Sequence, residues 1–185
     1  MTTLRLPNVL RDNQRRSIVA IVAVVVVIGY IMLLSHEENV MREYYDGLRS
    51  TNANLYLSKI LKARGFDKYL DEYLALHDYS KPTEEAPLFL VGRWALFDDK
   101  KRVGDDFVPD TCVPAVEIED GNLKFIDNEK NRYTARYTMN GPVVTAHIDG
   151  RDDVTVQVVG YGSHLHHIEV HDNSTGATRY GYMCR

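Results

Sequence analysis

The hydrophobic pattern divides the chain into an apolar run, a segment with helical periodicity and a segment with strand periodicity. The apolar run, Ile18–Leu34, carries no charge, follows an arginine pair and precedes a glutamate pair. As a helix it would rise roughly 26 Å, close to the ~30 Å hydrocarbon core of a bilayer. We therefore predict a transmembrane helix over residues 17–35.

This run fits an uncleaved signal anchor better than a signal peptide or a core helix. Signal peptides have apolar cores of about 7–15 residues and a small-x-small cleavage site. This run is longer, and no such site follows it. Arginines precede the run and glutamates follow it, so the positive-inside rule keeps residues 1–16 in the cytosol and exports the rest. The expected location is the inner membrane, with a periplasmic or otherwise extracytoplasmic C-terminal domain.

Helical periodicity follows the span. Ser35 and Glu38 match a capping box, which predicts that a new helix starts there. Apolar residues then recur at helical spacing up to Gly65, a typical helix stop, and a second amphipathic helix is predicted over Phe66–His77. The two helices form a predicted stalk over residues 36–78.

The apolar stripe of the first stalk helix has two interpretations. It packs on the protein's own domain, or it pairs with another membrane protein. In the second case the partner-facing residues would be Val40, Tyr44, Leu48 and Leu55.

From residue 88 onward the period of the pattern changes from 3.6 to 2. Residues 79–87 contain two prolines and no periodicity, which is typical of a linker. Alternating segments joined by Asp-Gly and Asn-Gly turns then predict seven to eight strands over residues 88–185. Such a meander closes into a small barrel or sandwich, because closure removes exposed edges, and its last strand could lie near its first.

The predicted fold class is therefore α+β. It consists of one N-terminal transmembrane helix, two juxtamembrane amphipathic helices and a mainly antiparallel β-meander closing into a small barrel or sandwich.

Two cysteines, Cys112 and Cys184, both lie in the predicted exported domain. An even count in an oxidising compartment favours one disulfide, and the alternative is two separate buried thiols. In a closed sheet the bond would tie the loop after the first strand to the last strand. Cys-x-x-Cys spacing is absent, which argues against a metal site at these residues.

Charge and motifs narrow the function classes. The formal net charge is -4, and arginines concentrate before the span, so the exported part is more acidic than the whole. A nucleic-acid partner would need a basic face, and we expect none. The chain has no Gly-x-Ser-x-Gly sequence and no phosphate-binding glycine loop. We predict no enzyme activity, no catalytic residue and no cofactor.

Four histidines gather near the end of the chain: His164, His166, His167 and His171. On a strand, residues two apart share a face but lie ~6.6 Å apart along it. A zinc site would therefore need ligands from another strand, and we predict no metal. The remaining interpretations are solvated or structural histidines and a pH-sensing cluster, since imidazole titrates near pH 6.5.

Aromatic and soft side chains occupy faces expected to point into the sheet domain. Barrels of about eight strands can hold one small apolar ligand, although the same side chains could simply fill the core. The candidate cavity residues are Trp94, Phe125, Tyr133, Tyr137, Met139, Tyr180 and Tyr182.

Gly92-Arg93-Trp94 in the first predicted strand resembles the Gly-x-Trp opening of lipocalin-like barrels. The layout as a whole resembles the bacterial ToxS/FidL type of membrane-anchored periplasmic partner protein, with two helices added after the span. Such proteins pair with a membrane-bound transcription regulator, stabilise its periplasmic part and can help to sense lipidic ligands.

The resemblance implies a non-enzymatic envelope protein that binds and stabilises a partner membrane protein. That partner would be a sensor or regulator, with a small apolar ligand as an addition. Two alternatives stay open. One is an immunity or inhibitor protein against a toxin or cell-wall hydrolase, and the other is a structural subunit of a larger membrane complex.

Overall fold

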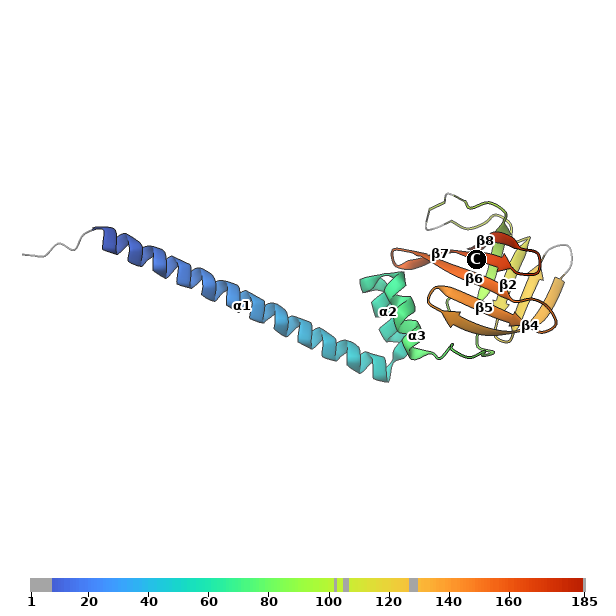
Figure 1. The fold of residues 1–185 in the computed structure, drawn as a ribbon, viewed down its shortest axis with the longest axis horizontal. Coiled ribbons are helices and arrows are strands. Elements are labelled where there is room, and N and C mark those ends of the chain that lie inside the picture. Colours follow the sequence, from blue (N-terminus) through green and yellow to red (C-terminus); the bar gives the residue numbers. More distant parts are fainter. Residues whose placement is uncertain (1–7, 102, 105–106, 127–129, 185) are drawn as a thin grey trace, which may run out of the picture. The chain divides into compact units, whose positions relative to one another are not determined.

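The computed structural model describes residues 8–184, apart from 102, 105–106 and 127–129. The chain divides into two units, and the division falls after Asn52. In its described residues the first unit is one long helix, and the second contains two helices and a sheet domain (Figure 1).

Helix α1 (Asn8–Thr51) contains the apolar run and continues beyond it. Ser35 lies inside this helix, and its hydroxyl donates to the carbonyl oxygen of Ile31, 2.9 Å away. The predicted start of a new helix at Ser35 is therefore wrong. Extending an existing helix adds a hydrogen bond for each residue, whereas a new start requires a costly nucleus.

Among the described residues, α1 is the helix that is long and apolar enough to cross a membrane. From Ala20 onward the apolar side chains of the run are exposed, with Val25 62% and Met32 67% exposed. An apolar surface of this extent needs lipid or protein to cover it. The helix can act as an anchor or a signal, and together with the disulfide of the second unit it indicates an extracytoplasmic domain.

Helices α2 (Ala53–Arg64) and α3 (Phe66–Leu76) follow, with Gly65 between them. Gly65 has a φ of 85°, and a Cβ there would lie 2.9 Å from the carbonyl oxygen of Gly162. Only glycine suits both the backbone angle and the close approach. The predicted stop at Gly65 and the second amphipathic helix are confirmed.

The second unit forms a closed antiparallel barrel, with eight strands in chain order among its described residues. The strands are β1 (Gly92–Phe97), β2 (Ala115–Glu119), β3 (Asn122–Ile126), β4 (Lys130–Asn140), β5 (Val143–Ile148), β6 (Val154–Tyr161), β7 (His164–Asp172) and β8 (Ala177–Met183). Pairing of β1 with β8 closes the barrel. The predicted fold class is confirmed, and closure gives a barrel rather than a sandwich.

The first strand is shorter than predicted, because residues 88–90 form a turn and β1 begins at Gly92. The amide of Leu90 donates to the carbonyl oxygen of Pro87 (2.7 Å), and the Leu90 side chain is fully buried. The carbonyl oxygen of Leu90 in turn accepts from the indole of Trp94 (2.9 Å). This turn fixes how the chain enters the barrel.

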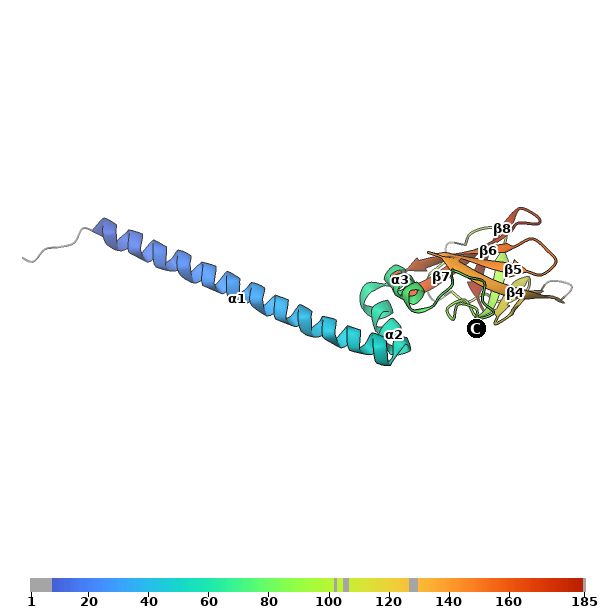
Figure 2. The ribbon, with the colours of Figure 1, turned by 60° about the horizontal axis from the view of Figure 1, so that its bottom comes forward.

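Alternating strand directions sort the connections onto two ends of the barrel. The capped end carries the β2–β3, β4–β5 and β6–β7 turns, and α3 lies beside it (Figures 1 and 2). Residues 79–87, whose composition indicates a linker, are bonded to this end. Thr83 pairs with Tyr137, and the carbonyl oxygen of Glu84 accepts from the amide of Gly121 (2.6 Å). The opposite end, which carries the remaining loops, is the open end.

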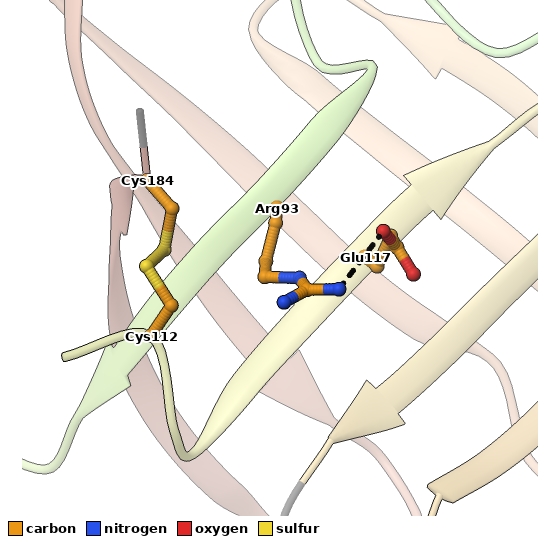
Figure 3. The surroundings of a disulfide bond; sticks show 4 residues. All are labelled: Arg93, Cys112, Glu117 and Cys184. Carbon is orange, nitrogen blue, oxygen red and sulfur yellow. Dashed lines mark hydrogen bonds and ion pairs between the residues drawn. A yellow bond between two sulfur atoms is a disulfide. The ribbon is translucent and has the colours of Figure 1, made fainter.

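A disulfide joins Cys112, in the loop before β2, to Cys184, directly after β8, as predicted. The amide of Cys184 donates to the carbonyl oxygen of Arg93 in β1 (2.8 Å). The Arg93 guanidinium pairs with Glu117 of β2 (3.4 Å), and both side chains lie near the disulfide (Figure 3). A disulfide, a backbone hydrogen bond and an ion pair therefore hold the end of β8 and the start of β2 close to β1, and we call this region the seam.

Replacing both cysteines by serine should lower the free energy of unfolding by about 4 kcal/mol, because the bond closes a loop across 72 residues. The fluorescence of the single Trp94 during urea unfolding of the detergent-solubilised chain measures this change. Reductant should shift the unfolding midpoint of the wild type and leave that of the double variant unchanged. Equal midpoints for oxidised and reduced wild type would contradict the stabilising role.

Candidate functional site

The first candidate surface is a groove at the capped end, formed by α2, α3, residues 85–91 and the β2–β3 turn. Its volume is about 580 Å³. We name it the capped-end groove, and its apolar and aromatic lining consists of Leu57, Leu61, Tyr69, Tyr73, Leu88 and Val91.

Leu88 is the most exposed apolar residue of this lining. Its side chain is 66% exposed and that of Val91 is 38% exposed. The backbone of Leu88 is nevertheless held, since its amide donates to the hydroxyl of Tyr73 (3.1 Å), which lies 3.3 Å from the hydroxyl of Tyr79. Leu88 therefore lies in a turn whose backbone is fixed by a hydrogen bond, while its side chain is exposed.

The Tyr69 phenol of the groove is held in its neutral form. Burial, and to a smaller extent the neighbouring Tyr73, raise the pKa of Tyr69 to about 12. A neutral phenol presents an apolar ring with a hydrogen-bonding tip, a combination that is enriched at protein interfaces.

The second candidate is a pocket of about 240 Å³ at the open end of the barrel. Phe125 and Tyr133, two of the residues predicted to line a cavity, form part of its wall. The charged residues Arg151, Asp172 and Arg179 also line it. We name it the open-end pocket, and its charged lining distinguishes it from a purely apolar cavity.

Arg151 is the residue that organises the open-end pocket. Its guanidinium donates to the Asp172 carboxylate (2.8 Å) and the Ser174 hydroxyl (2.9 Å). Its Cζ atom lies 5.4 Å from the ring centroid of Phe125 and 5.0 Å from that of Tyr133. This geometry combines a charged hydrogen bond with a cation–π contact.

The pKa of Asp172 is set by the groups that contact its carboxylate. Burial alone would raise the pKa of Asp172, but hydrogen bonds from Ser174 and Arg151 outweigh burial and hold that pKa below its usual range.

Sequence reasoning missed Arg151 as a site residue. Its signal was a cation placed directly after the Asp149-Gly150 turn in an acidic domain.

The other predicted cavity residues lie elsewhere. Trp94, Tyr137 and Met139 are buried in the core. Gly181 of β8 faces Ile168, so Tyr180 and Tyr182 lie on the other side of the strand, where Tyr182 is buried and its hydroxyl is bonded to the backbone of Lys101. The prediction of a small apolar ligand stays a prediction, with Phe125 and Tyr133 as the residues nearest to a pocket.

The structure brings two of the four clustered histidines together. The register between β6 and β7 shifts at a bulge: Val159 pairs with His167 and Gly160 pairs with Leu165, which leaves His166 between the two pairs. His166 and His167 thereby approach each other, with their Nδ1 atoms 2.8 Å apart, so that one ring donates and the other accepts. His164 begins β7 opposite Tyr161, and the Nδ1 of His171 lies 2.9 Å from the Thr178 hydroxyl.

His167 is the buried member of the pair, at 2% exposure, and its ring stacks on Tyr182. Its Nε2 atom is buried without a hydrogen-bond partner and lies 3.6 Å from the Glu169 carboxylate. Burial first, then the charges of Lys100 and His166, lower the pKa of His167. Across the described residues, no group of three or more His, Cys, Asp or Glu side chains could hold a metal ion.

The residues predicted as one partner-binding stripe do not share one helix. The first helix ends at Thr51 and the next begins at Ala53. Near this break the hydroxyls of Ser50 and Thr51 donate to the carbonyl oxygen of Gly47, which competes with regular helix bonding. The stripe is therefore split, with Val40, Tyr44 and Leu48 in α1 and Leu55 in α2.

Comparison of the chain with protein-family models, curated proteins and solved structures gives no match. The barrel alone does not define a function, because one fold supports many. The features that bear on function are therefore the apolar helix α1 and the two ends of the barrel.

Replacing Arg151 by leucine should cost about 1–3 kcal/mol of stability, because it leaves the half-buried Asp172 carboxylate without its cation. Arg136→Leu is the matched control, since Arg136 and Asp149 form a 3.5 Å pair with both side chains more than half exposed. That control should cost less than about 1 kcal/mol. Urea unfolding measures both changes, and equal losses would contradict the assigned role of Arg151.

Stability should fall in acid through His167. Its pKa in the folded chain lies below the ordinary value of 6.5, so the unfolded chain binds more protons. The contribution of His167 is complete above about pH 6.5 and is lost as the pH falls through the folded pKa. Unfolding midpoints between pH 7.5 and 5 should fall less for His167→Phe than for wild type or for the half-buried control His171→Gln. Parallel pH profiles would contradict this.

Proposed function

We propose that the chain is a non-enzymatic, single-span envelope protein whose exported barrel binds and stabilises a partner membrane protein. The observation that carries the proposal is Leu88, an apolar side chain that a bonded turn displays on the capped-end groove. An ordered, exposed apolar surface of this kind is typical of a protein-binding site.

In this proposal α1 remains uncleaved as the anchor. The arginines before the apolar run keep the tail in the cytosol, and the barrel lies on the other side of the inner membrane. The disulfide between Cys112 and Cys184 supports an oxidising compartment.

The tether limits which partners the groove can reach. Residues 35–51 of α1 continue the helix past the apolar run for roughly 26 Å, and α2 begins after one further residue. This covalent tether confines the groove to the membrane that holds α1, which raises its effective concentration toward other membrane proteins. The architectural resemblance to ToxS/FidL-type partner proteins supports the same class of partner.

Leu88→Glu should abolish binding of the partner membrane protein, because it places a carboxylate among the apolar side chains of the groove. The tagged full chain is crosslinked in its native membrane and purified, and the enriched proteins are quantified by mass spectrometry. We expect recovery of one membrane protein to fall at least about tenfold, equivalent to 1.4 kcal/mol.

Val113→Glu is the control, since Val113 is 56% exposed but lies outside the groove. It should leave recovery of the partner unchanged. Equal recovery with both variants would contradict binding through the groove. Enrichment of a toxin or cell-wall hydrolase would favour the immunity alternative.

A further inference from the structure

The charges of the capped-end groove all have the same sign. Two carboxylates, Glu85 and Asp120, line the groove beside Leu88, and no Lys or Arg occurs among its described lining residues. An apolar groove with only negative charge at its edge disfavours acidic ligands and anionic lipid headgroups.

The remaining ionisable groups of the groove lining are His77, Tyr69 and Tyr73. His77 stacks on Tyr73 with ring centroids 4.2 Å apart, and its Nδ1 donates to the Tyr73 carbonyl oxygen at 3.0 Å. Burial, then the hydrogen bond to Tyr73, and also the charges of Glu85 and Asp120 raise the pKa of nearby Tyr79. The negative field of the two carboxylates therefore reaches Tyr79, whose hydroxyl lies 3.3 Å from that of Tyr73 in the groove lining.

The two carboxylates differ in how free they are. Asp120 Oδ1 accepts from the amide of Ala86 at 2.9 Å, so this side chain also holds the turn in place. Glu85 is exposed at the edge, and its own amide donates to the Thr83 hydroxyl. Glu85 is thus the carboxylate that can be changed without removing a side-chain bond of the turn that carries Leu88.

We infer that the groove binds a basic, amphipathic protein segment that places apolar side chains on Leu88 and Val91 and a Lys or Arg beside Glu85. This inference rests on the proposed function and specifies the chemistry of the partner. Charge complementarity of this kind selects the partner and sets its orientation. The apolar lining supplies the buried contact, as in other helix-in-groove complexes.

The test uses the full chain in its native membrane with a photocrosslinking amino acid at Ser58, an exposed polar residue that lines the groove. Mass spectrometry identifies the crosslinked peptide. We expect a segment of another membrane protein with a Lys or Arg within one helical turn of its apolar residues. A crosslink to an acidic segment, to lipid or to α1 of the same chain would overturn the inference.

Charge reversal separates the inference from the proposed function. Glu85→Lys should lower the crosslink yield at least about tenfold, whereas the matched control Glu84→Lys, an exposed neighbour outside the groove lining, should leave it unchanged. A protein crosslink that is insensitive to Glu85→Lys would overturn the basic-partner inference and leave the proposed function standing. The absence of any protein crosslink would overturn both.

Discussion

Pairing of β1 with β8 is the contact on which the rest of the domain depends. It extends from Trp94 opposite Met183 to Phe97 opposite Tyr180. Gly181 makes it possible, because a Cβ at that position would lie 2.6 Å from Ile168 inside the barrel. Closure removes both sheet edges, and the disulfide after β8 holds the chain at the same seam. The closed barrel has two ends. The capped-end groove lies at one of them and the open-end pocket at the other.

The capped end combines a backbone hydrogen bond with a close side-chain contact. The amide of Phe66 donates to the carbonyl oxygen of Gly162, and the Phe66 ring occupies the space left by Gly160. The segment before β1 is then bonded between α3 and the turns, so Leu88 is exposed while Leu90 two residues later is fully buried. At the open end, the Arg151–Asp172 pair instead holds two loops together over an aromatic wall.

Much of the fold could be predicted from period and turn chemistry. Alternation around Asp-Gly and Asn-Gly identified the hairpins, and an even cysteine count in an exported domain identified the disulfide. Local signals failed where two rules competed. The capping box at Ser35 was overridden by continuation of α1, and the strand pattern of residues 88–90 was overridden by the turn that buries Leu90.

The candidate site was harder to predict, because it depends on a pair distant in sequence and on an irregularity within one strand. Nothing near Arg151 indicates that Asp172 lies 2.8 Å away. A bulge in β7, which strict alternation of side chains does not predict, lets the rings of the neighbouring residues His166 and His167 contact each other.

Hydroxyl-radical footprinting in native membrane vesicles tests whether the capped-end groove is a protein-binding surface. We expect Leu88 and Val91 to be oxidised several-fold more slowly in membranes than in the detergent-purified chain, with Val113 unchanged. Equal oxidation of Leu88 in both preparations would contradict it.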